Sequence, residues 1–402
     1  MTATPTVPLG HLALVRPSSV DKVANESETP VRLCNYTDVY YGDRITNELS
    51  FMQGTATAGE IRRFELQRDD VLITKDSETA DDIAIAAWVA EDLPGTVLGY
   101  HTSLLRPRAG IDGRFLYWAL QAHPLRDYFE QHARGVTRHA LRQQDVTQAP
   151  VPRPSLAVQR RIADYLDTET ASIDRLLERN ADLQQLVLER LEAFIEYRIW
   201  GSSPELVPLQ YRTTRLTVGV VVRPAELMAP AGPPFLRGVN IERNHVLPSN
   251  LVHIDADANK ANSKSMLEPG DVLMVRTGDA GVSAVVPEWA IGGNSSGLLL
   301  IRPDRRLIDP VFLAYTLNSG LAREHIRLRT QGAIQQSFPT SELGGIPVPN
   351  IPLEAQGAVV EEVSSLAARV RDGVDRLRRQ AELLWERRRA LITAAVTGEL
   401  EV

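Results

Sequence analysis

The segment PVPRPSLAVQRRIADYL at residues 150–166 recurs as PVPNIPLEAQGAVVEEV at residues 347–363, and each copy continues into a long helical pattern that closes on a glycine. When residues 150–201 are placed on residues 347–398 without a gap, 13 of the 52 positions are identical. The identities include prolines, a glutamine and the closing glycine, whereas chance similarity between two amphipathic helices would match leucines alone. The sequence therefore predicts an internal duplication.

Shorter matches extend the duplication upstream of both helical patterns. They pair Val7-Pro8-Leu9 with Val207-Pro208-Leu209, residues 70–75 with residues 271–276, Arg106-Pro107 with Arg302-Pro303, and Arg32 and Asn35 with Arg237 and Asn240. An offset of about 200 residues is far longer than the 20–50 residues of a solenoid repeat. We therefore expect a two-part unit, a globular domain followed by a helix, to occur twice.

The composition is that of an ordinary soluble protein with room for two domains: 402 residues, of which 43% are apolar and 24% charged. The single cysteine, Cys34, excludes an internal disulfide or a cysteine metal cluster and favours a reducing compartment. No secretory signal is evident, and the longest notable apolar run, Ile83 to Ala90, is far short of the ~20 residues of a membrane span. We expect a cytoplasmic protein without a membrane partner.

The overall charge of -7 and a pI near 5.7 argue against a simple nucleic-acid coat. The distribution of charge is more informative than the sum. Residues 104–142 carry seven arginines against three acidic residues, and the matching residues 302–329 carry six arginines. Either stretch alone is typical of a solvated surface, but its repetition in both halves also fits a basic binding surface.

The spacing of apolar residues predicts the secondary structure. Residues 5–110 and 205–303 alternate short β-rich runs, such as Val71 to Thr74 and Val272 to Val275, with Gly, Pro, Asn and Asp. A single helix is expected at about 112–131 in the first half and at about 309–327 in the second. The fold class is therefore α+β, with two similar α/β domains.

The second part of each unit is a long amphipathic helix. Apolar residues recur at three- and four-residue steps, and Gly201 followed by Pro204 is a stop signal. Neither helix has an apolar partner within its own repeat, so we expect the two to pack on each other as a coiled coil.

An approximate two-fold axis between the halves would make these helices antiparallel, with the globular domains at opposite ends. Residues 169–199 would span roughly 46 Å at 1.5 Å per residue, and successive major-groove faces of DNA are about 34–36 Å apart. Two heads on such a support would address two short sequences separated by a gap of unread bases.

This order of domains and helices resembles the specificity subunits of type I restriction-modification enzymes. The resemblance is most specific at PVPRPSLAVQRRIADYLDTETASIDRLLERN, at ERRRALITAAVTGEL, and in the segments RGVTRHALRQQDVTQAPVP and TQGAIQQSFPTSELGGIPVP that precede the helices. It implies target-recognition domains at residues 1–149 and 202–346, each reading one half of a bipartite double-stranded DNA target. It also implies conserved helical spacers at residues 150–201 and 347–402, which bind the methyltransferase subunits.

The resemblance further implies two methyltransferase subunits per chain and a restriction/translocase subunit, with S-adenosylmethionine and ATP bound by these partners and no cofactor in this chain. The residues assigned to the coiled coil or to partner binding are Gln159, Ile162, Leu166, Ile173, Leu177, Leu186, Phe194, Gln356, Val370, Val374, Leu384 and Leu391. The second helix has Gly373 where the first has Leu176, and Gln380 where the first has Leu183, so the register of the pair stays open.

The motifs of an enzyme are missing. Gly232-Pro233-Pro234-Phe235 has the shape of an amino-methyltransferase tetrad, but glycine cannot supply the polar contact to the target amine. No P-loop is present, and the glycine-rich residues 276–281 are better read as a turn after a strand. The eight histidines have no metal-binding spacing. We therefore expect neither catalytic nor metal-binding residues.

If DNA is the ligand, arginine can bond bidentately to guanine, and glutamine to adenine, while other basic residues position the phosphates. The candidates are Lys75, Arg106, Arg134, Thr137, Arg138, His139, Arg276, Arg302, Gln331, Gln335 and Gln336. Each could equally be a loop cap or a surface charge. Two rival functions stay open: a protein-protein adaptor with two heads on a coiled coil, and, less favoured, a methyltransferase fused to its own recognition domains.

Overall fold

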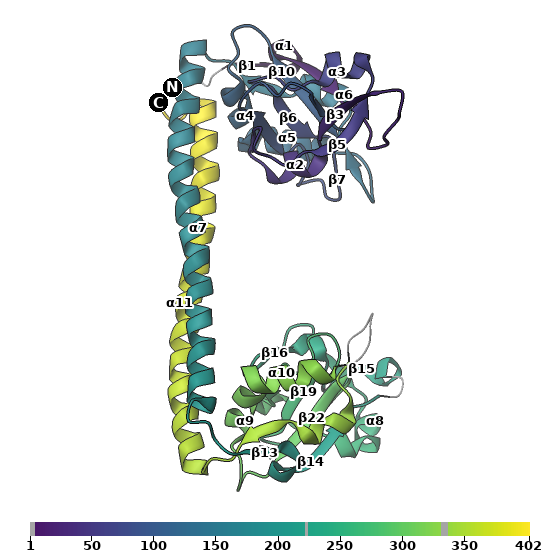
Figure 1. Cartoon of the computed structure of the whole chain (residues 1–402), viewed down its shortest axis with the longest axis vertical. Helices are drawn as coiled ribbons and strands as arrows, with labels where there is room; N and C mark the ends of the chain where they lie inside the picture. The colour runs from purple at the N-terminus through teal and green to yellow at the C-terminus, as the bar shows by residue number, and fades with distance from the viewer. Residues whose placement is uncertain (1–4, 222–223, 331–336) are drawn as a thin grey trace. The chain divides into compact units, whose positions relative to one another are not determined.

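The computed structural model describes residues 5–221, 224–330 and 337–402. It divides into two compact units, unit 1 with Met1–Ala181 and Leu377–Val402, and unit 2 with Asp182–Arg376. Each unit contains one globular head, head 1 (residues 5–155) or head 2 (residues 201–352), together with parts of both long helices (Figure 1).

Head 1 has two main sheets. The larger runs in the order β2 (Ala13–Pro17), β10 (Thr102–Pro107), β6 (Val71–Thr74), β8 (Ala86–Val89) and β4 (Arg44–Ile45). The smaller runs β5 (Met52–Ala56), β3 (Thr29–Cys34) and β9 (Thr96–Leu98). Neighbouring strands are antiparallel except for the parallel pairs β4 with β8 and β3 with β9. Short helices connect them: α1 (Leu9–Leu12), α2 (Tyr36–Tyr41), α3 (Ala58–Phe64) and α6 (Gln143–Gln148).

Head 2 repeats this topology, except that its described residues include no counterpart of β4. Its larger sheet runs in the order β14 (Thr213–Val218), β22 (Leu298–Pro303), β19 (Val272–Val275) and β20 (Ser283–Val285), and its smaller sheet runs β18 (Val252–Ile254), β15 (Met228–Leu236) and β21 (Asn294–Ser295). The pair β15 with β21 is parallel, like β3 with β9. A hairpin of β16 (Ile241–Glu242) and β17 (His245–Val246), and the helix α8 (Ala256–Ala261), complete it. The shared strand order supports the duplication predicted from the sequence.

The central strand of each head is buried on both faces, which explains its run of apolar residues. In β6, Val71 and Ile73 belong to the core beneath the helices, whereas Leu72 belongs to the core between the two sheets. In β19, Met274 and Leu273 divide in the same way. Because successive side chains of a strand point to opposite faces, a four-residue apolar run can serve two cores.

Each head has two short helices where the sequence predicted one. They are α4 (Gly113–Gln121) and α5 (His123–His132) in head 1, and α9 (Pro310–Leu317) and α10 (Gly320–Arg329) in head 2. The prediction of one helix was wrong because Pro124 lacks the N–H that a continuous helix would need, and Ala122 is extended. In head 2, Ser319 is extended and begins the second helix.

A two-stranded ladder closes each head where its long helix begins. Strand β1 (Thr6–Pro8) pairs with β12 (Pro150–Pro152), and β13 (Leu206–Pro208) pairs with β23 (Pro347–Pro349). The repeated Val-Pro-Leu and Pro-Val-Pro sequences are therefore partners of one another in space, which explains why both recur in each copy.

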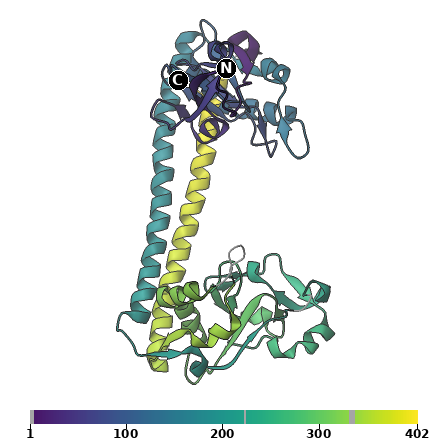
Figure 2. The same cartoon turned by 45° about the vertical axis from the view of Figure 1, so that its right-hand side comes forward.

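The long helices α7 (Leu156–Trp200) and α11 (Leu353–Thr397) are each 45 residues long. In unit 1, Leu166 near the start of α7 shares a core with Ile392 near the end of α11. In unit 2, Ile199 at the end of α7 shares a core with Val363 near the start of α11. The start of one helix thus packs on the end of the other in both units, so the predicted antiparallel pairing is confirmed, and both helices can be followed in Figure 2. Across the described ranges, no helix is both long and apolar enough to cross a bilayer.

A buried glutamine ties the start of each long helix to its own head. The Gln159 side chain accepts a hydrogen bond from the Asp112 N–H at 2.9 Å and donates to the Gly110 and Pro154 carbonyls. Gln356 does the same with the Asp309 N–H at 2.8 Å and with the carbonyls of Leu307 and Ile351. Both glutamines are about 1% exposed. Their recurrence is explained by this three-bond contact with the head.

The end of each long helix contacts the head of the other repeat. In unit 2, a Glu196 carboxylate oxygen of α7 accepts from the Gly320 N–H at 2.7 Å. In unit 1, the Thr393 hydroxyl of α11 accepts from the His123 N–H at 3.1 Å. Both contacts satisfy the first N–H of the second short helix. Each head is therefore bound to the start of one long helix and the end of the other.

Gln159→Ala is expected to loosen the start of α7, because two carbonyls and one N–H lose their buried partner. The cost is about 1–3 kcal/mol for each group left unsatisfied. Hydrogen exchange of residues 156–166 measures it, with Gln185→Ala as the control, since the exposed Gln185 bonds only to Glu189 among the described residues. Equal exchange in Gln159→Ala and the parent chain would contradict the anchoring role.

Candidate nucleic-acid interface

Two of the predicted DNA-binding arginines are bound to buried carboxylates. Arg106 bonds to Asp70 through Nε at 2.8 Å and Nη2 at 2.7 Å, and Arg302 bonds to Asp271 through Nε at 2.8 Å and Nη2 at 2.9 Å. Each also donates to a backbone carbonyl, that of Glu65 or Met266. Burial raises the pKa of the Asp70 carboxyl, and the hydrogen bond from Arg106 opposes that rise.

These bonds give Arg106 and Arg302 a structural role at equivalent places in the two heads. A guanidinium already bonded bidentately has few donors left for a base. Their assignment to DNA stays a prediction, and neither belongs to the surface described below.

Other arginines of the basic stretches are also bonded within the protein. Arg114 pairs with Asp164 and Asp167 of α7, and Arg126 donates to the Asp81 and Ile83 carbonyls, with its pKa lowered by burial. In head 2, Arg323 pairs with Asp279 and Arg327 with Glu324. The basic stretches are therefore in part structural, as the solvated-surface interpretation expected.

In both heads, the end of the central strand lies beside the segment that precedes the long helix. The Lys75 carbonyl accepts from the Leu141 N–H at 2.9 Å, and the Arg276 carbonyl accepts from the Phe338 N–H at 2.9 Å. The sequence predicted Lys75 and Arg276 separately from the pre-helix residues, and the fold brings the two sets together.

In head 1 this junction forms a tip. The residues from Arg134 to Ala140 form a turn closed by two hydrogen bonds between the backbones of those two residues, at 3.1 and 2.9 Å. Strand β11 (His139–Ala140) then pairs with β7 (Asp76–Ser77). The tip carries the predicted Arg134, Thr137, Arg138 and His139, and the predicted Lys75 directly precedes β7.

A carboxylate lies at the centre of the tip. Asp76, whose side chain is 10% exposed, accepts from Arg138 Nη2 at 2.5 Å and lies 2.6 Å from His101 Nδ1. The Arg138 side chain is 58% exposed. Neither Asp76 nor His101 was a predicted site residue.

Tyr36 of α2 lies near this carboxylate and begins a row of three tyrosines. Tyr36 stacks on Tyr40 with ring centres 5.4 Å apart, and Tyr40 meets Tyr41 edge to face at 4.8 Å. A 2.6 Å hydrogen bond from the Tyr40 hydroxyl to Asp82 raises the pKa of Tyr40 to about 12. Burial, followed by the charges of Asp82 and Asp76, raises the pKa of Tyr36. The Tyr40 hydroxyl is thus committed to Asp82, and its ring stays available for stacking.

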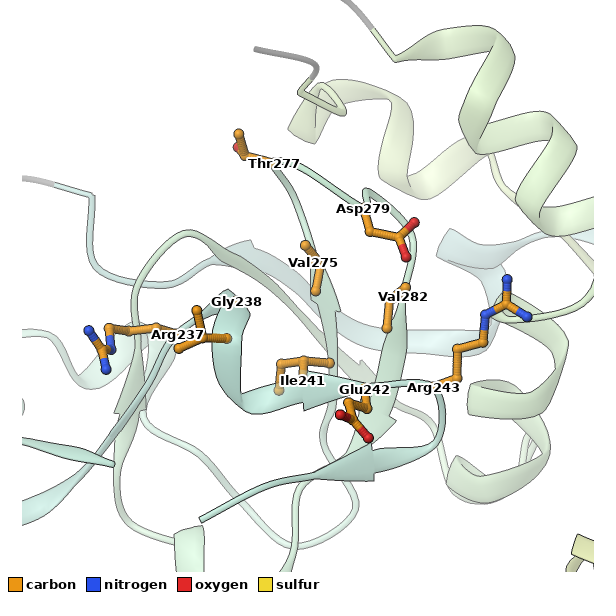
Figure 3. A pocket seen from close by; sticks show the side chains of 10 residues that line it. Arg237, Gly238, Ile241, Glu242, Arg243, Val275, Thr277, Asp279 and Val282 are labelled. Atoms are coloured by element: carbon orange, nitrogen blue, oxygen red, sulfur yellow. The ribbon is translucent and has the colours of Figure 1, made fainter. Parts of the chain in front are cut away.

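The corresponding junction in head 2 borders a pocket of about 660 Å³. Its lining residues are Arg237, Gly238, Val239, Ile241, Glu242, Arg243, Val275, Thr277, Asp279 and Val282. Figure 3 shows Thr277 and Asp279 on the turn that follows β19, and Arg243 in the β16–β17 hairpin. Thr277 bridges to Ser337, beyond the segment that holds Gln331, Gln335 and Gln336. Those three predicted residues lie outside the described residues.

The residues predicted for the helix pair occupy three settings. Ile162, Leu166 and Ile173 are buried in α7, as is Val374 in α11. Leu177, Phe194, Val370, Leu384 and Leu391 are half-buried. Leu186 is 53% exposed, so it contributes little to the helix pair. One contact shows the register of the helix pair in unit 1. The buried Asn180 of α7 donates to the carbonyl of Leu377 of α11 at 3.0 Å.

No cluster of His, Cys, Asp or Glu that could hold a metal ion occurs within residues 5–221, 224–330 and 337–402. The tip of head 1 is a mixed surface of cations, an anchored arginine and tyrosines. Such a set can bond to base edges and phosphates, because it combines hydrogen-bond donors with stacking faces.

No protein-family model matches the chain. Its sequence is 23% identical over 286 residues to the type I restriction enzyme StySPI specificity subunit of Salmonella potsdam, covering 67% of this chain and 62% of that protein. The match therefore spans less than two thirds of the relative's length.

Two solved structures share the fold over nearly the whole chain. One is from work on complex assembly and conformational transition of a type I restriction-modification system, with a TM-score of 0.79, 17% identity and coverage of 100% of this chain and 99% of that chain. The other is the HsdS subunit of Thermoanaerobacter tengcongensis, with a TM-score of 0.53, 18% identity and coverage of 98% and 97%. The chain therefore has the fold of the type I restriction-modification specificity subunits, and the family resemblance predicted from its sequence is confirmed.

Proposed function

We propose that this chain is the DNA-specificity subunit of a type I restriction-modification system. It is non-catalytic and reads a bipartite double-stranded DNA target, with one head for each half-site. The proposal rests on one arrangement that occurs in both heads. The end of the central strand, at Lys75 in head 1 and at Arg276 in head 2, lies beside the segment that precedes the long helix. A single-headed reader would need this arrangement only once.

The target-recognition domains in this proposal are residues 1–149 and 202–346, and the spacers are residues 150–201 and 347–402. Head 1 contacts DNA through its tip, which includes Lys75, Arg134, Thr137, Arg138 and His139. Head 2 uses Arg276, the pocket beside it, and Gln331, Gln335 and Gln336. Because each long helix is continuous over 45 residues, the number of unread base pairs between the half-sites is expected to be constant.

Two methyltransferase subunits bind the helices, one for each repeat. The support is a pair of exposed leucines: Leu186 of α7 is 53% exposed and Leu383 of α11 is 64% exposed. They are equivalent in the repeat, since 383 minus 186 is 197, the same offset as 347 minus 150. Single exposed leucines are common on protein surfaces, so the support lies in the repetition of this exposure at the same place in both copies.

The remaining subunit is a restriction/translocase, which is brought in through the assembled complex. S-adenosylmethionine and ATP bind the partner subunits, and this chain needs no cofactor of its own. A cytoplasmic location follows from access to chromosomal and invading DNA.

Methylome sequencing tests the proposal. Cells that produce this chain with its partner subunits are compared with cells lacking only this chain. We expect one split motif, two short specified blocks with a constant gap, to be methylated only in the first. An unchanged methylome would favour the adaptor alternative, and methylation of DNA by the purified chain alone would favour the fused methyltransferase.

A further inference from the structure

The Asp76 carboxylate joins three segments that are distant in the sequence. Asp76 lies on β7, His101 directly precedes β10, and Arg138 lies on the turn before β11. One carboxylate oxygen accepts from Arg138 Nη2 and the other lies 2.6 Å from His101 Nδ1. Both oxygens of a mostly buried carboxylate are thus committed to orienting two neighbours.

The backbone at His101 is strained. Its φ of 72° is in the left-handed region, which costs a residue other than glycine free energy. The His101 carbonyl accepts from the Lys75 N–H at 2.9 Å. The centre of the His101 ring lies 3.9 Å from the centre of the Tyr100 ring. This conformation places the imidazole against Asp76, and strain retained at an exposed tip is more typical of functional sites than of plain surface loops.

The turn that carries Arg138 requires glycine at position 135. Gly135 has a φ of 133°, and a Cβ added there would lie 1.9 Å from the Arg138 carbonyl oxygen. The turn is held at its ends by the two hydrogen bonds between the Arg134 and Ala140 backbones. These contacts restrict the backbone at Arg138, and the bond to Asp76 orients its side chain.

We propose that Asp76 is a positioning residue that aims Arg138 at a guanine in the half-site read by head 1. This inference rests on the proposed function. Arg138 Nη2 donates one N–H to Asp76 and lies 3.2 Å from His101 Nδ1, which itself donates to Asp76, whereas Nε and Nη1 make no hydrogen bond to any other described residue. The second N–H of Nη2 and the N–H beside it, on Nη1 or Nε, form a pair of adjacent donors that matches the O6 and N7 acceptors of guanine in the major groove.

Asp76 also argues against a phosphate as the ligand of Arg138. A carboxylate 2.5 Å from the guanidinium offsets its charge and repels a phosphate, so it weakens a contact that depends on charge. A base edge is read by the direction of hydrogen bonds, and an anchored guanidinium keeps that direction. The pair therefore favours sequence discrimination over general affinity.

At the positions equivalent to Asp76 and Arg138, the sequence of head 2 has Thr277 and Gln335. Since Lys75 matches Arg276 in the repeat, the position of Asp76 is taken by Thr277, whose hydroxyl lies 3.4 Å from that of Ser337. The two heads thus read their half-sites with different groups, and an Asp76 variant should affect only one of them.

The test is Asp76→Asn in the full chain with its partner subunits, read out by methylome sequencing. Asparagine keeps the size and an acceptor but loses the charge that anchors Arg138. We expect discrimination at one G·C pair of one half-site to fall about tenfold or more, a value typical of one bidentate contact. The other half-site, the gap and the melting temperature should stay unchanged, and Arg138→Lys should relax the same base pair.

Arg142 and Asp145 provide a matched control in the same head. They form a two-bond pair with side chains 56% and 8% exposed, close to the 58% and 10% of Arg138 and Asp76. Arg142→Lys and Asp145→Asn should leave the discriminated base pair intact. Relaxation of that same pair in the control variants would overturn the inference.

A binding measurement separates positioning from a general loss of structure. The complex is titrated with its target duplex and with the same duplex carrying 7-deazaguanine, which lacks the N7 acceptor, at the affected position. The parent complex should lose affinity for the modified duplex, and the Asp76→Asn complex should lose much less. An equal loss in both complexes would overturn the positioning role.

The outcomes separate this inference from the proposed function. A parent complex that methylates no split motif refutes the proposed function, and the inference with it. A split motif that is unchanged in Asp76→Asn and Arg138→Lys refutes the inference alone. So does a split motif whose half read by head 1 contains no G·C pair.

Discussion

A chain carrying both Leu186→Glu and Leu383→Glu is expected to fold normally but to bind no methyltransferase subunit. Both side chains are more than half exposed in the chain itself, so the substitutions remove little of its own packing. In the proposed assembly they would instead bury a carboxylate in an apolar contact, which is strongly unfavourable for an unpaired charge. Because this leucine occurs once in each repeat, the number of methyltransferase subunits bound to each variant can be counted.

Each single variant is expected to retain one of the two partners. Native mass measurement of the co-purified complex gives the number of partner subunits directly, with two for the parent chain, one for each single variant and none for the double variant. Leu328→Glu is the control, because Leu328 is 66% exposed but lies on α10 of head 2. Two partners on the double variant would contradict the proposed docking positions.

Asp271→Ala is expected to destabilise head 2 by about 3–5 kcal/mol, since removing one partner of a buried ion pair leaves the other uncompensated. Asp271 is fully buried, and the Arg302 side chain is only 16% exposed. The Glu268 N–H, which donates to Asp271 at 2.7 Å, would lose its acceptor as well. Denaturant unfolding, followed by hydrogen exchange within head 2, measures the change.

Two further substitutions serve as comparisons for Asp271→Ala. Asp70→Ala removes the equivalent pair with Arg106 and should destabilise head 1 while leaving head 2 unaffected. Glu324→Ala removes the exposed pair with Arg327 in head 2 and should cause no measurable change, because such pairs are screened by solvent. If Asp271→Ala unfolded at the same denaturant concentration as the parent, the buried pair would not have the structural role assigned to it.

The sequence predicted the parts of the fold whose signals are local or repeated. Residues 71–74 and 272–275 form the predicted strands because a continuous apolar run fits a strand buried on both faces. The antiparallel helix pair followed from apolar spacing together with the duplication. The break at Ala122 was missed, since the apolar pattern continues across it and only Pro124 signals it.

The candidate site was harder to predict because it depends on tertiary contacts. Arg106 and Arg302 were selected for their repetition, and their bonds to Asp70 and Asp271 give that repetition a structural reason, while their assignment to DNA stays a prediction. Asp76 and His101 were missed because a lone aspartate in a strand and a left-handed histidine have no pattern in the sequence. Residues that occur in both repeats could therefore be identified from the sequence, but the sequence did not show whether each has a structural role or a role in DNA recognition.

The most direct test of the two-headed reader is selection of bound DNA from a pool of randomised duplexes by the complex of this chain with its methyltransferase partners. Sequencing of the retained duplexes should give two short specified blocks at a constant separation, with no preference at the bases between them. Retention of a single contiguous block, or of duplexes without sequence preference, would contradict the account.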